Sequence, residues 1–88
     1  MKFLETIDVH DSEKSIDETA VDQFATMMKA KLEVKRNQGY NSWYDETLCS
    51  NEKLSCMLRD HVEKGDPLDV ALLAMMLYMR GSGILVEG

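Results

Sequence analysis

Four acidic residues recur at intervals of three along the second half of the chain: Asp60, Glu63, Asp66 and Asp69. Carboxylates three positions apart share one face of a helix, and carboxylate oxygens are ligands that Mg²⁺ accepts in proteins. Two such pairs across a helix hairpin can therefore hold Mg²⁺. A structural interpretation competes with this metal site, because Asp66 and Asp69 also suit the N-cap and first turn of a helix.

Other residues offer less chemistry. His61 follows Asp60 and is a candidate base, although a single histidine on a helix flank is more often a surface residue. We find no nucleophile paired with a base, no glycine-rich phosphate loop and no Cys/His metal set in the sequence. The spacing of Cys49 and Cys56 suits neither a zinc site nor a redox pair, so we expect free, mostly buried thiols in a reducing cytoplasm.

The elements that position these residues are predicted to be helices. We expect residues 1–14 to form a flexible acidic arm or an extended segment. Ser15 and Glu18 resemble a capping box that starts a helix over about 16–38, and Gly39 follows its end. This helix has acids first and bases last, which suits its dipole. Its apolar stripe is Val21, Phe24, Ala25, Met28 and Leu32.

Two further helices are predicted to form an antiparallel hairpin. Ser50 or Asn51 can cap a helix over 51–64 that ends at Gly65. Asp66 and Pro67 then start a helix over 67–80 at once, since proline suits the first helical position. The sequence thus predicts an all-α fold, a three-helix domain over residues 15–88 that ends in this hairpin.

The last helix is apolar on nearly every side, from Val70 to Met79. These ten residues are about half of what a bilayer span needs, so we expect no membrane insertion. A helix without a polar face must be covered all round, which favours a homo-oligomer over a groove for another partner. The predicted oligomer interface comprises Leu72, Met75, Met76 and Met79.

An aromatic connector joins the first two helices and contains Tyr40, Trp43 and Tyr44. Aromatic side chains are frequent at binding hot spots, but they also fold back as a lid over a core. A basic group precedes the connector, and it can hold a phosphate or an acidic surface or simply complement its own helix dipole: Lys29, Lys31, Lys35 and Arg36. The net charge of −6 argues against general nucleic-acid binding.

The segment from Gly39 to Arg80 resembles a shortened form of the all-α MazG-like nucleotide pyrophosphohydrolases of phages. Asn37–Gln38–Gly39–Tyr40, with Trp43, resembles the connector before their acidic helix. Residues 64–67 and 69–77 resemble their closing helix, which begins with a metal-binding aspartate. In that family, paired acids on two helices bind Mg²⁺ and activate water against a nucleoside triphosphate. The resemblance assigns this role to Asp60, Glu63, Asp66 and Asp69.

The chain departs from the family pattern at two positions of these motifs. Arg59 stands in place of one expected acid, and Leu72 stands where the family usually has asparagine. The resemblance therefore implies a helical, oligomeric architecture more than catalysis. Our leading hypothesis is a non-enzymatic, phage-type accessory protein that binds a host macromolecule, such as a counter-defence (anti-CRISPR-like) inhibitor without a cofactor. The alternative is a Mg²⁺-dependent nucleoside triphosphate pyrophosphohydrolase, or a nucleotide-binding remnant of one.

Overall fold

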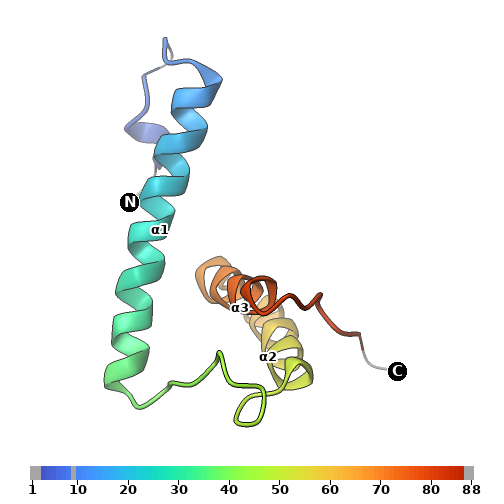
Figure 1. The fold of residues 1–88 in the computed structure, drawn as a ribbon. Coiled ribbons are helices and arrows are strands. Elements are labelled where there is room, and N and C mark those ends of the chain that lie inside the picture. The colour runs from blue at the N-terminus through green and yellow to red at the C-terminus, as the bar shows by residue number, and fades with distance from the viewer. Residues whose placement is uncertain (1–2, 9, 87–88) are drawn as a thin grey trace. The chain divides into compact units, whose positions relative to one another are not determined.

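The computed structural model of the chain describes residues 3–8 and 10–86, and all regular elements within them are helical (Figure 1). They are a short 3-10 helix η1 (Phe3–Glu5) and the α-helices α1 (Glu13–Asn37), α2 (Asn51–Lys64) and α3 (Pro67–Met79). The predicted all-α fold is confirmed. Contacts group the chain into two compact units, residues 1–34 and 35–88, and each is described by itself. One packed domain over 15–88 stays a prediction, and residues 87 and 88 lie outside the described part.

Helix α1 begins at Glu13, about three residues before the predicted helix start at residue 16. The Ser12 hydroxyl accepts the Ser15 N–H at 3.2 Å, and the Ser12 carbonyl accepts the Ile16 N–H at 3.0 Å. Ser12 is therefore the cap, and the prediction of Ser15 in this role was wrong. The earlier start adds nearly a full helical turn, and it brings Lys14 within 2.6 Å of Glu18 as an i,i+4 ion pair.

The predicted N-terminal arm contains local turns. The Thr6 hydroxyl donates to the Phe3 carbonyl across η1 at 2.7 Å, so residues 3–6 are not extended. A hollow of about 330 Å³ lies between Phe3 and one flank of α1, where it is lined by Ala20, Gln23, Phe24 and Met27. Met1, Lys2 and Val9 of the predicted arm lie outside the described residues, and its flexibility stays a prediction.

The hairpin of α2 and α3 follows the predicted caps. The Ser50 hydroxyl accepts the Lys53 N–H at 3.1 Å, and Gly65 ends α2 at a left-handed φ of 77°. The Asp66 side chain accepts the Leu68 and Asp69 N–H groups at 3.0 and 3.3 Å, with Pro67 at the start of α3. The adjoining caps leave no room for a longer loop, so α2 and α3 pack against each other.

Four leucines form the core of this hairpin. Leu54 and Leu58 of α2 meet Leu73 and Leu77 of α3. Burying each side chain contributes about 1.5–3 kcal/mol before the entropy of ordering the chain is subtracted. This cluster holds α2 and α3 in register, so it also fixes the ends of the helices from which the flanking segments extend.

The predicted oligomer interface on α3 is only partly available. Leu72 is 3% exposed, so it is already covered within one chain and the prediction for this residue was wrong. Met75 and Met76 are half-buried, whereas Met79 is 67% exposed. One partner helix and the adjoining segments cover more of α3 than its apolar sequence suggests. None of the helices in the described part of the chain is long and apolar enough to cross a membrane.

Candidate functional site

The four acids of the predicted Mg²⁺ site do not come together. Asp60 and Glu63 are exposed on α2, the Asp66 carboxylate caps α3, and Asp69 is buried. Among residues 3–8 and 10–86, no group of three or more His, Cys, Asp or Glu side chains could hold a metal ion. The donor set therefore does not fit Mg²⁺, and the structural interpretation of Asp66 and Asp69 accounts for both positions.

Asp69 has a different neighbour, which the sequence spacing did not reveal. Its Oδ2 atom lies 3.6 Å from Nδ1 of His61, across the turn between α2 and α3. This distance exceeds that of a hydrogen bond, and His61 Nδ1 has no hydrogen-bond partner. The contact joins the last turn of α2 to the first turn of α3, so it is an interaction between the two helices of the hairpin.

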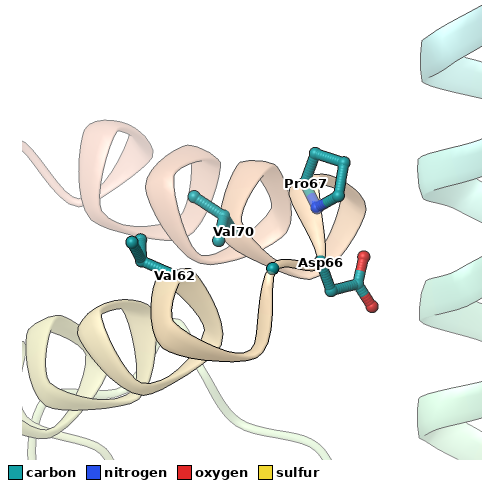
Figure 2. A pocket seen from close by; sticks show the side chains of 5 residues that line it. Val62, Asp66, Pro67 and Val70 are labelled. Atoms are coloured by element: carbon teal, nitrogen blue, oxygen red, sulfur yellow. The ribbon is translucent and has the colours of Figure 1, made fainter.

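The outer side of the same turn has a shallow apolar hollow of about 340 Å³, lined by Val62, Gly65, Asp66, Pro67 and Val70. Figure 2 shows Val62 and Val70 on neighbouring helices, while the Asp66 carboxylate points away from both. The hollow therefore presents mainly hydrocarbon surface and lacks the convergent polar groups of a small-molecule site.

The aromatic connector, residues 38–50, is ordered by its own turns. The Asp45 carbonyl accepts the N–H groups of Leu48 and Cys49 at 3.1 and 2.8 Å. The Asp45 carboxylate accepts the Thr47 hydroxyl at 2.6 Å and the Thr47 N–H at 2.9 Å. The Thr47 hydroxyl bond is the largest cause that lowers the pKa of Asp45 below its ordinary value of 3.8. Asp45 therefore stays ionised to a lower pH than an ordinary aspartate, and its carboxylate holds the turn through Thr47.

Arg80, the last residue associated with α3, anchors this connector. Its side chain is 6% exposed, and Nη1 donates to the Trp43 carbonyl at 2.9 Å and to the Cys49 carbonyl at 2.5 Å. Its Nη2 lies 3.6 Å from the Glu46 carboxylate. One buried guanidinium thus joins two points of the connector to the end of α3. Sequence reasoning missed Arg80, although a single base that closes an apolar helix is a recognisable signal.

The anchored connector turns two of its three aromatic residues outward. Tyr40 is 63% and Tyr44 is 70% exposed, whereas Trp43 is half-buried. The Trp43 and Tyr44 rings meet edge to face with centroids 5.8 Å apart, and Lys35 Nζ lies 5.3 Å from the centre of the Tyr40 ring. Trp43 suits the predicted lid in part, while the exposed tyrosines suit contact with a partner.

The two cysteines are free, as predicted. Cys49 is half-buried beside the core cluster, but Cys56 is exposed on α2. The prediction of mostly buried thiols was therefore wrong for Cys56, because its position on α2 lies off the face that packs against α3. Neither thiol belongs to a metal set in the described residues.

Comparison with protein-family models, with curated proteins and with solved structures finds no match to this chain.

Proposed function

We propose that this chain is a non-enzymatic, phage-type accessory protein that binds a host protein through its aromatic connector. The single observation behind the proposal is the Arg80 anchor, which holds residues 43–49 on α3 while Tyr40 and Tyr44 remain exposed. A surface ordered before binding loses less conformational entropy when the partner arrives. Exposed tyrosines on an ordered segment are suited to act as binding hot spots.

Charge near Tyr44 and on the whole chain favours one kind of partner. Asp45, Glu46 and Glu52 are acidic and the chain carries a net charge of −6, while Lys35 lies against the Tyr40 ring. A net acidic protein favours a basic protein surface and associates with it faster at low salt. The same charge disfavours direct phosphate contacts with nucleic acid.

In its most specific form, the proposal is a counter-defence (anti-CRISPR-like) inhibitor that acts in the host cytoplasm. A basic groove that normally receives nucleic acid has the charge that this connector complements, and an acidic protein can compete for it. We also expect the chain to form a homo-oligomer, which does not depend on the binding of a host protein.

Site-specific photocrosslinking in host cells tests the proposal. A photoreactive phenylalanine analogue replaces Tyr44 in one variant and Lys64, an exposed residue at the end of α2, in the control. We expect a host protein with a basic surface to crosslink at position 44 and not at position 64. Adding Tyr40→Ala to the first variant is expected to reduce that product. Identical products from both positions, or no product at position 44, would rule out the connector as the binding site.

A further inference from the structure

Helix α1 has an apolar stripe that its own unit leaves uncovered. The helix has 25 residues and none of them is buried. Along the stripe, Val21 is 66% exposed, and Ala25, Met28 and Leu32 are only half-buried. Phe24, the remaining residue of the stripe, is 42% exposed and lines the hollow beside Phe3 together with Ala20 and Met27. Val21, Ala25, Met28 and Leu32 do not line that hollow. A narrow apolar seam therefore runs along the middle of α1.

An isolated helix of this length is marginally stable in water, because its formation costs a nucleation step and its stability comes mainly from packing an apolar face. The spacing of Val21, Ala25, Met28 and Leu32 alternates between four and three residues. This is the spacing of the seam of a two-stranded coiled coil, in which each residue packs between residues of a second helix. The stripe is thus suited to another helix.

The charges along α1 identify that second helix. Its first ten residues carry Glu13, Asp17, Glu18 and Asp22 against Lys14 alone, whereas its last ten residues carry the four predicted bases against Glu33 alone. Side by side in the same direction, two copies would place acid against acid and base against base. In opposite directions, each acidic half meets a basic half.

We propose that α1 is a self-association surface through which two copies of this chain pair antiparallel. In the register that brings the stripes together, Val21 of one copy lies opposite Leu32 of the other, and Ala25 lies opposite Met28. The same register places Glu18 opposite Lys35 at both ends of the seam. Each contact occurs twice because the pair has a two-fold axis. The inference concerns α1 alone, and it stands whether or not the connector binds a host protein.

The oligomeric state of matched variants tests the surface. Val21 on α1 and Met79 on α3 are almost equally exposed, at 66% and 67%. We expect the intact chain to sediment as a dimer. Val21→Ser should raise the dissociation constant of the dimer about tenfold, because two-fold symmetry removes each lost contact at two places. Met79→Ser, in the interface that the sequence predicted on α3, is expected to leave the dimer unchanged, because in this proposal α1 and not α3 joins the two copies. A monomeric intact chain, or a dimer that Met79→Ser weakens and Val21→Ser does not, would overturn the proposal.

Thiol crosslinking tests the orientation in a chain that carries Cys49→Ser and Cys56→Ser. Val21→Cys and Leu32→Cys variants are mixed and treated with a short bis-maleimide. The antiparallel register predicts a mixed crosslinked dimer, with far less product from either variant alone. Product from each variant alone, at a yield equal to the mixture, would indicate parallel helices and overturn the proposed register.

Discussion

The Arg80 guanidinium donates to the backbone carbonyl of Trp43 at 2.9 Å, across 37 residues of sequence. The same Nη1 atom reaches the Cys49 carbonyl, so the donor closes both ends of a seven-residue stretch that contains the exposed Tyr44. A charged donor strengthens each of these bonds, and its burial raises the cost of losing them. The connector therefore depends on a residue that belongs to the far end of the hairpin.

Replacing this donor is expected to release the connector. Arg80→Met keeps much of the apolar length but leaves two carbonyls without their donor, so we expect the free energy of unfolding to fall by about 2–3 kcal/mol. Trp43 is the only tryptophan, and its fluorescence in a urea titration reports both the loss of stability and a more solvent-exposed environment. Arg36→Met, at an exposed position of α1, is the control and should change stability by less than about 0.5 kcal/mol. Unchanged Trp43 emission in Arg80→Met would contradict the claim that Arg80 holds the connector on α3.

Acid is expected to loosen the connector through Asp45. Its pKa is lower in the folded chain than the ordinary value of 3.8, so the stabilisation is complete above that value and is lost as the pH falls through the lower folded pKa. Thr47→Val removes the hydroxyl whose hydrogen bond is the largest cause of the lowered pKa. The pKa of Asp45 should therefore rise toward 3.8. NMR titration of the Asp45 carboxyl group measures both values. Equal pKa values in the two proteins would show that Thr47 does not hold this carboxylate.

Magnesium is expected to leave the protein unaffected. Because Asp60, Glu63, Asp66 and Asp69 do not form a donor set, millimolar Mg²⁺ or its removal with EDTA should not shift the melting temperature. Asp69→Ala should lower stability by about 1 kcal/mol or less, equally with and without Mg²⁺, because it removes the acid in the first turn of α3 and the contact with His61. Pyrophosphate release from nucleoside triphosphates, abolished in Asp69→Ala, would instead support the MazG-like hypothesis.

The segment that follows α3 should depend on Ser55. The hydroxyl of this fully buried residue accepts the Leu85 N–H at 2.9 Å, and the Arg59 guanidinium donates to the Leu85 carbonyl. Ser55→Ala removes the first acceptor, so the Leu85 amide should exchange its hydrogen markedly faster, with a loss of about 1 kcal/mol in stability. Ser82→Ala removes a local hydroxyl contact and is the control. Slow exchange of the Leu85 amide in Ser55→Ala would show that this bond does not hold the segment.

Local features were predictable from the sequence because they depend on neighbouring residues. The cap at Ser50, the left-handed Gly65 and the Asp66–Pro67 start of α3 all follow from bonds that span a few positions. The predicted cap of α1 was wrong for a related reason. Ser12 and Ser15 each carry a hydroxyl that can cap a helix, and Ser12 is the cap because the helix extends about one turn further toward the N-terminus.

The sequence by itself determined that the chain is helical, where the hairpin turns, and that α1 carries opposite charges at its two ends. Only the tertiary structure decided that Leu72 is covered and Met79 is exposed, that Asp69 meets His61 and not a metal set, and that Arg80 holds the connector. These relationships cross from one helix or segment to another, and they depend on the register in which α2 and α3 pack. Spacing along the sequence carries no information about that register, since several faces of an apolar helix can satisfy the same hydrophobic driving force.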